Sequence, residues 1–213
     1  MYYGAHDLLF LGEPGAFEPV GPRPDWLGGA WQARAPLVVR REATSHGRLP
    51  VGARGPLRNQ RLAGYVDGAV VQQRVTPEML AQAPVPAGPP CLAALARLAP
   101  RLAGLGLAWG PIGGVGFQLA SGLPVLRETS DLDLLVRAPR PLPAGTVAAL
   151  AALQRDADCR IDIQVDTGSG GFALAEYARG GRVLLKTAHG PVLLDDPWQG
   201  RWQQDRWQKD EAA

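Results

Sequence analysis

The chain has 213 residues, of which 46% are hydrophobic and 20% are charged, with a formal net charge of +2. This composition is sufficient for a buried core in one large domain or two small ones. No apolar run approaches the roughly 20 residues of a membrane-spanning helix, and the first residues lack the basic segment of a secretion signal, so we expect a cytoplasmic protein without a membrane partner. The two cysteines and three histidines are scattered, which argues against zinc chemistry and a cysteine-histidine nucleophile.

The basic residues are unusual in kind and in position. Twenty of the 22 are arginine, whose planar fork suits phosphate, although a compositional bias would also explain part of the excess. Between residues 34 and 61 a single acid, Glu42, faces seven arginines, at positions 34, 40, 41, 48, 54, 58 and 61. This stretch is expected to attract an anionic ligand.

The first part of the chain, residues 1–82, is predicted to form a small strand-rich module. Short apolar segments at 8–11, 37–39, 65–66 and 69–71 are separated by glycine and proline. A proline-rich connector over 83–90 has too few backbone donors for a helix interior. We therefore place a domain boundary there, with a second domain over 83–213.

The second part predicts alternating helices and strands. Helical spacing covers 92–102, a strand covers 105–111, and a glycine turn at Gly113 and Gly114 opens a helix that ends near 122. Further helices are expected over 147–155 and 172–178, followed by a hairpin of 182–186 and 192–194. In the charged tail, Trp202 and Trp207 are expected to pack against the domain. The pattern predicts an α+β architecture.

Two carboxylates stand two residues apart in a predicted strand over 130–136. Because side chains alternate along a strand, Asp131 and Asp133 share one face while the leucines between them enter the core. Neighbouring carboxylates repel each other unless a cation joins them, and Mg²⁺, or another divalent cation, is commonly held by one or two carboxylates plus phosphate oxygens. A second alternating strand over 160–166 carries Asp162 and Asp166, either of which could serve as the third acid.

Glycines and arginines complete a predicted phosphoryl-transfer site. Backbone N–H groups at Gly113 and Gly114 can approach phosphate oxygens closely at a helix start. Of the first module's arginines, Arg54, Arg58 and Arg61 are the leading candidates for phosphate binding. Each feature also has a plainer explanation: a tight turn for the glycines, a solvated strand face for the acids, and ordinary surface charge for the arginines.

The order of these motifs resembles a known superfamily. Gly113-Gly114, then Asp131-Leu132-Asp133, then Asp162 is similar to the nucleotidyltransferase signature of DNA polymerase β-like enzymes. Two departures are the glycine at position 114, where many members carry serine, and a long interval to Asp131. The resemblance implies a mixed sheet flanked by helices in the second domain, with Asp131, Asp133 and Asp162 as catalytic metal ligands.

A closer resemblance covers nearly the whole chain. The segments PVGARG at 50–55, GGVGFQLASG at 113–122, SDLDL at 130–134 and GFALAEYARG at 171–180 resemble the phosphoribosyl-dephospho-CoA transferases of malonate decarboxylase. That family moves a phosphoribosyl-dephospho-CoA group from triphosphoribosyl-dephospho-CoA to a serine of the acyl-carrier subunit and releases pyrophosphate. A citrate-lyase type of carrier is not separated from this one on physical grounds.

Two other functions remain open on the sequence: another nucleotidyltransferase acting on RNA, a small molecule or a protein, and a non-catalytic anion-binding module. From residue 83 onward, 13 basic residues balance 13 acidic ones, and few aromatics are available for base stacking, so no nucleic acid partner is expected. Three clustered acids would repel a nucleic acid backbone in the absence of metal, which disfavours the binding module.

Overall fold

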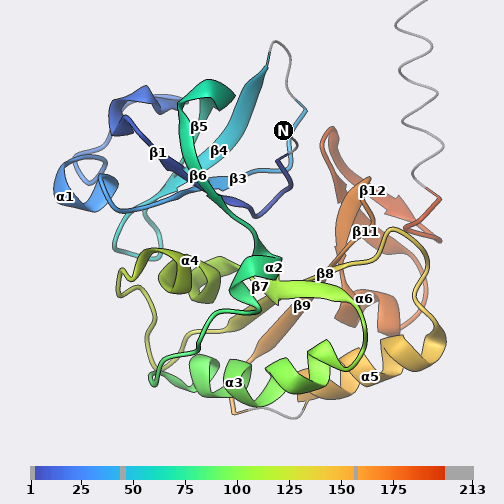
Figure 1. Ribbon diagram of the computed structural model, residues 1–213. Helices are drawn as coiled ribbons and strands as arrows, with labels where there is room; N and C mark the ends of the chain where they lie inside the picture. The colour runs from blue at the N-terminus through green and yellow to red at the C-terminus, as the bar shows by residue number, and fades with distance from the viewer. Residues whose placement is uncertain (1–2, 44–46, 156–157, 200–213) are drawn as a thin grey trace, which may run out of the picture.

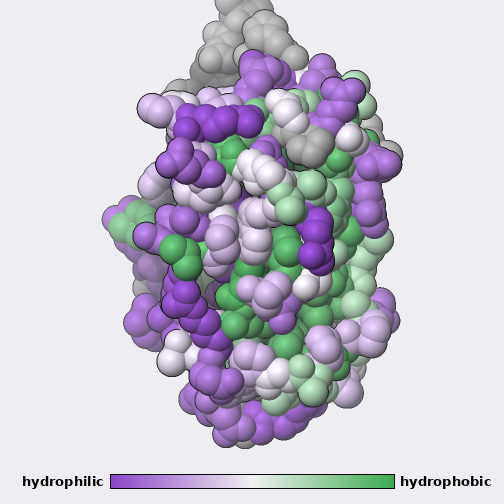
Figure 2. Space-filling view, turned by 90° about the vertical axis from the view of Figure 1, so that its left-hand side faces the viewer, coloured by the Kyte–Doolittle hydropathy of each residue, from purple (hydrophilic) through white to green (hydrophobic). Residues whose placement is uncertain are grey.

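A computed structural model describes residues 3–43, 47–155 and 158–199, and these residues form two six-stranded sheets (Figure 1). The expectation for Trp202 and Trp207 lies outside the described residues. Seen from the side of α1, hydrophobic residues gather in the middle of the surface and hydrophilic residues surround them (Figure 2).

The first sheet is antiparallel, with strand order β2-β5-β4-β3-β1-β6. Its strands are β1 (Leu8–Leu11), β2 (Glu18–Pro19), β3 (Leu37–Val39), β4 (Arg48–Arg54), β5 (Arg61–Asp67) and β6 (Val71–Val75). Between them lie η1 (Pro14–Ala16), α1 (Gly29–Gln32) and η2 (Gly68–Val70). The fully buried Leu9, Val51 and Val66 belong to its core cluster, which is separate from the larger core of the second sheet.

The second sheet has the order β12-β11-β10-β9-β8-β7, and only β8 and β9 run parallel among its described pairs. Its strands are β7 (Ala108–Pro111), β8 (Leu132–Arg137), β9 (Ile161–Asp166), β10 (Gly170–Ala173), β11 (Val183–Thr187) and β12 (Gly190–Leu194). The helices that pack on this sheet are α2 (Pro77–Leu80), α3 (Pro90–Ala103), α4 (Gly113–Ser121), α5 (Ala144–Arg155) and α6 (Leu174–Ala178).

Alternation along β8 and β9 divides the second sheet into an apolar and a polar face. Leu132, Leu134 and Ile163 enter the core that α3, α5 and α6 cover (Figure 1). Asp133 and Gln164 point to the opposite face and line a cavity together with residues of the first sheet. The polar face is therefore the one that meets the N-terminal module.

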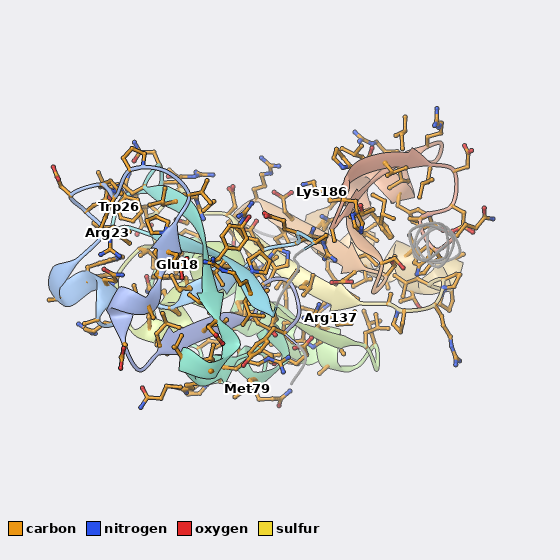
Figure 3. The ribbon with its side chains drawn as sticks, turned by 90° about the horizontal axis from the view of Figure 1, so that it is seen from above. Glu18, Arg23, Trp26, Met79, Arg137 and Lys186 are labelled. Carbon is orange, nitrogen blue, oxygen red and sulfur yellow. The ribbon has the colours of Figure 1, made fainter. Side chains whose placement is uncertain are left out.

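The two modules are joined by close packing and by an ion-pair network. A Cβ atom at Gly110 of β7 would lie 1.7 Å from the carbonyl oxygen of Pro77, so the backbone of α2 packs directly against the second sheet. Arg41 and Arg137 each donate to Asp166 Oδ2 at 2.8 Å, and Figure 3 shows Arg137 between the two sheets. We call Arg41, Arg137 and Asp166 the interdomain latch.

The structure confirms the predicted α+β class, with a strand-rich first part and a mixed, helix-flanked sheet in the second. Two local predictions were wrong, and one strand was missed. Asp131 lies just before β8 rather than within it, Phe172 belongs to β10 rather than to a helix, and strand β4 was not predicted. In the described part of the chain, no helix is long and apolar enough to cross a membrane.

Candidate active site

Asp133 lies at the centre of the candidate site. It sits on β8, and its Cα pairs with that of Asp162 across the parallel β8–β9 register. Burial raises the pKa of Asp133, and the charges of Asp162 and Asp131 raise it further. Negative charge is therefore concentrated here, as is expected where a cation binds.

Position 113 must be glycine because its backbone lies very close to the side chain of Asp133. Its φ is +61°, and a Cβ atom there would lie 2.1 Å from Asp133 Oδ2. Only glycine combines this backbone conformation with such a close approach. At the next position, a Cβ on Gly114 would lie 3.6 Å from an Nη atom of Arg54. The start of α4 thus separates a carboxylate from a guanidinium.

The β4–β5 hairpin supplies the arginines. Arg54 and Arg61 pair at its end, and Arg58 lies in the connecting turn. Arg58 reaches to 3.6 Å from Asp131 Oδ2, although its side chain is mostly exposed. Arg54 and Arg61 line the same two cavities as Asp133. The sequence separates these arginines from the acids by some 70 residues, and the fold brings them together.

Arg54 is the most unusual of the three arginines. It is only 7% exposed, its guanidinium lies 5.2 Å from the ring centroid of Phe117, and its Nε has no hydrogen-bond partner. Burial lowers the pKa of Arg54 to about 10, with the charges of Arg61 and Arg58 contributing, so it remains protonated at neutral pH. A buried guanidinium whose Nε is left without a hydrogen-bond partner among the described residues is a strong indication of an anionic ligand.

Two adjoining cavities meet at these residues. The larger has a volume of about 560 Å³ and the smaller about 120 Å³, and Arg54, Arg61 and Asp133 line both. The smaller cavity also contacts Arg58, Arg127, Gly114 and Asp131. It is therefore an arginine-rich space that ends on two carboxylates.

The two acids of β9 have different surroundings. Asp162 is 46% exposed, pairs with Arg160 at 3.0 Å and is not among the residues that line either cavity. Burial alone would raise the pKa of Asp166, but Arg41, Arg137 and the Gly168 N–H lower it overall. Asp166 is thus engaged in the interdomain latch, which leaves Asp162 as the better candidate for the third acid.

The chemistry of these groups suits a cation shared with a ligand. In the described ranges, no three histidine, cysteine, aspartate or glutamate side chains are gathered so that they could hold a metal ion by themselves. Asp131 and Asp133 line the same small cavity, and phosphate oxygens would have to complete the coordination, which is the usual arrangement for Mg²⁺. The residues fit a divalent cation bound jointly with a phosphate ligand.

Several lining residues were not anticipated from the sequence. His6, Gln164 and Lys186 line the larger cavity, and Arg127 lines the smaller one. The side chain of Lys186 is exposed and also borders the cavity. The polar position of Gln164 between Asp162 and Asp166 was the one available signal, since alternation places it on their face.

Comparison with known proteins covers both modules. Residues 4–77 match the family described as phosphoribosyl-dephospho-CoA transferase MdcG N-terminal domain, and residues 79–197 match the C-terminal domain of the same family. The chain belongs to the phosphoribosyl-dephospho-CoA transferase family. The predicted resemblance to this family is confirmed.

Curated relatives with this family name align with the chain along most of their own length. Phosphoribosyl-dephospho-CoA transferase of Klebsiella pneumoniae (strain 342) is 42% identical over 91% of this chain and 95% of its own. The proteins of that name from Pseudomonas aeruginosa PAO1 and Pseudomonas putida are 46% and 45% identical, over 91% of this chain and 93% and 94% of theirs. No solved structure matches the chain significantly.

Proposed function

We propose that this transferase moves the 2′-(5″-phosphoribosyl)-3′-dephospho-CoA group from its triphosphate precursor to a serine of the malonate decarboxylase acyl-carrier subunit. The observation that carries the proposal is the arginine-rich cavity that ends on Asp131 and Asp133, in a chain of this family. A triphosphate fits such a cavity because guanidinium groups pair with phosphate oxygens in a planar, two-pronged geometry.

The arginines would bind the phosphates and stabilise the leaving group. Arg54 would hold a phosphate oxygen with its guanidinium, while Arg58 and Arg61 would neutralise charge on the departing pyrophosphate. Backbone N–H groups at Gly113 and Gly114 would donate to the same oxygens, since no side chain intervenes. Asp131 and Asp133 would hold a divalent cation, which when bound would neutralise phosphate charge and lower the pKa of the attacking hydroxyl.

The transfer itself is a displacement at the α-phosphorus. The serine oxygen forms a bond to this phosphorus, and the bond from the phosphorus to the pyrophosphate oxygen breaks. We assign acceptance of the serine proton to Asp162, because its backbone pairs with that of Asp133 and because Asp166 is held by two arginines.

Intact-mass measurement of the carrier protein tests the proposal. The carrier is incubated with this protein, Mg²⁺ and either the triphosphate precursor or ATP. We expect a mass gain of one phosphoribosyl-dephospho-CoA group with the precursor only, and none in a carrier whose acceptor serine is replaced by alanine. A nucleotide-sized gain with ATP would instead identify another kind of nucleotidyltransferase, and no gain with the precursor would refute the proposal.

A further inference from the structure

The larger cavity differs chemically from the smaller one. It is lined by apolar side chains from both modules, among them Leu8, Val39 and Phe117, by the neutral amide of Gln164, and by four arginines and Lys186, which suit the phosphate groups of the donor. If the triphosphate occupies the arginine-rich cavity, the α-phosphorus lies near Asp133, and the organic part of the donor must continue into the larger space. A volume of about 560 Å³ is within the usual range for such ligands.

His6 stands on the wall of this cavity in a constrained position. It is the one non-glycine residue with positive φ in the described part of the chain, at 74°. Its backbone N–H donates to the carbonyl of Val39 at 2.9 Å, which fixes it against β3. A bulky residue in the left-handed region is energetically costly and is concentrated at functional sites.

His6 and Gln164 line the same cavity from the two modules. His6 belongs to the N-terminal module and Gln164 to β9, so each module contributes one member of the pair. Burial lowers the pKa of His6 to about 4, with Arg41 and Arg137 lowering it and Asp166 and Gln164 opposing them. The imidazole is therefore neutral at physiological pH, with one donor and one acceptor nitrogen.

We propose that His6 and Gln164 read the nucleobase of the donor within the larger cavity. A neutral imidazole and an amide together present donors and acceptors, as the edge of a nucleobase does, and the apolar wall provides contact for its faces. A charged pair would suit phosphate or carboxylate instead. The inference rests on the proposed function, because that function places the dephospho-CoA part of the donor here.

Two probes separate the two cavities: dephospho-CoA, which carries the base but lacks the triphosphate, and inorganic pyrophosphate. Gln164→Leu and His6→Asn are tested by calorimetry in the full-length protein with Mg²⁺. Asparagine is chosen at position 6 because it tolerates the left-handed conformation, so the fold should be retained. We expect dephospho-CoA to bind about fivefold to tenfold more weakly to each variant, with pyrophosphate affinity unchanged.

Two further variants serve as controls. His189→Ala removes an exposed imidazole at the β11–β12 turn and should change neither affinity. Arg127→Ala should show the reverse pattern, with weaker pyrophosphate binding and unchanged dephospho-CoA binding.

Each remaining outcome contradicts a specific claim. Unchanged dephospho-CoA affinity in both His6 and Gln164 variants would overturn the assignment while leaving the proposed function intact. An equal loss for both probes would show that the pair only holds the modules together, and would also overturn it. A wild-type protein that binds neither probe would refute the proposed function and the inference with it.

Discussion

At the scale of single residues, Gly113 allows the backbone at the start of α4 to approach the carboxylate of Asp133 closely. Gly113→Ala would force a Cβ atom to within 2.1 Å of Asp133 Oδ2 at a φ that costs a non-glycine residue about 1–2 kcal/mol. We expect an unfolding free energy lower by about that amount and transfer slowed by about a hundredfold, since Asp133 must move. Denaturant unfolding and initial transfer rates measure the two effects.

Gly145→Ala is the matched control for this substitution. Gly145 lies in α5, and a Cβ there meets no heavy atom within 4 Å. Alanine should stabilise the helix by about 0.5–1 kcal/mol and leave transfer unchanged. A Gly113→Ala protein as active as wild type would contradict the importance of the contact with Asp133.

A different prediction concerns Arg54, because its buried charge lowers the stability of the folded protein when no anion is bound. Arg54→Met keeps an apolar contact with Phe117 and removes the repulsion from Arg58 and Arg61. We expect the variant to be about 1 kcal/mol more stable than wild type without ligand, yet to lose the increase in Tm that pyrophosphate gives wild type. Thermal unfolding with and without pyrophosphate provides the measurement.

The corresponding control is Arg140→Met, an exposed arginine that borders neither cavity. Its pyrophosphate-induced Tm shift should equal that of wild type. If Arg54→Met retained the full shift, the anion would have to bind elsewhere.

At the scale of elements, β9 carries two acids on one face with different roles. Asp166→Asn removes the carboxylate between Arg41 and Arg137 and should lower the unfolding free energy by about 2–4 kcal/mol. Asp162→Asn should cost less than about 1 kcal/mol, because its ion pair with Arg160 is exposed, but should slow transfer strongly. Urea unfolding and transfer assays on both variants check this; a stable, inactive Asp166→Asn protein would reverse the assignment.

Elements with regular alternation could be predicted from the sequence. The apolar positions Ile161, Ile163 and Val165 identified β9, and the leucines of β8 identified that strand, because each strand buries one face. Their pairing came only from the structure. Strand β4 was missed since Pro50 and Gly52 interrupt its pattern, and its hydrogen-bonded neighbours on both sides stabilise it instead. Arg54, Arg58 and Arg61 were named without β4, from residue type and local charge, whereas Asp131 and Asp133 were named from their spacing in a predicted strand.

At the scale of the whole molecule, the contacts between modules were beyond sequence reasoning. His6 and Gln164 are 158 residues apart, and Arg41 meets Asp166 at a separation of 125 residues. The periodicity of a single element cannot predict such pairs, because they depend on how the two sheets pack against each other. The proposed base-reading pair and the latch were for this reason visible only in the structure.

The same interface predicts a pH dependence of stability. Below the ordinary histidine pKa of 6.5, the unfolded chain binds a proton that folded His6 does not take up until about pH 4. The free energy of unfolding should therefore decrease as the pH is lowered from 6.5 to about 4. Arg41, Arg137 and Asp166 surround this imidazole. Asp166 and Glu78, whose pKa values are lowered in the folded protein, should then lose their contribution at still lower pH.

Urea midpoints at pH 7 and pH 5 test this for wild type and His6→Asn. Wild type should be less stable at pH 5, whereas the variant should show a smaller difference between the two values. An identical fall in both proteins would mean that another group titrates in this range.

The central claim is that Asp133 is the carboxylate at which the donor reacts. It is tested most directly by the rate at which the carrier protein gains the prosthetic-group mass with Asp133→Asn compared with Asp158→Asn, a highly exposed acid paired with Arg97. The account predicts a loss of about a thousandfold for Asp133→Asn with the fold retained, and a wild-type rate for Asp158→Asn. Transfer by Asp133→Asn within a few-fold of wild type would contradict it.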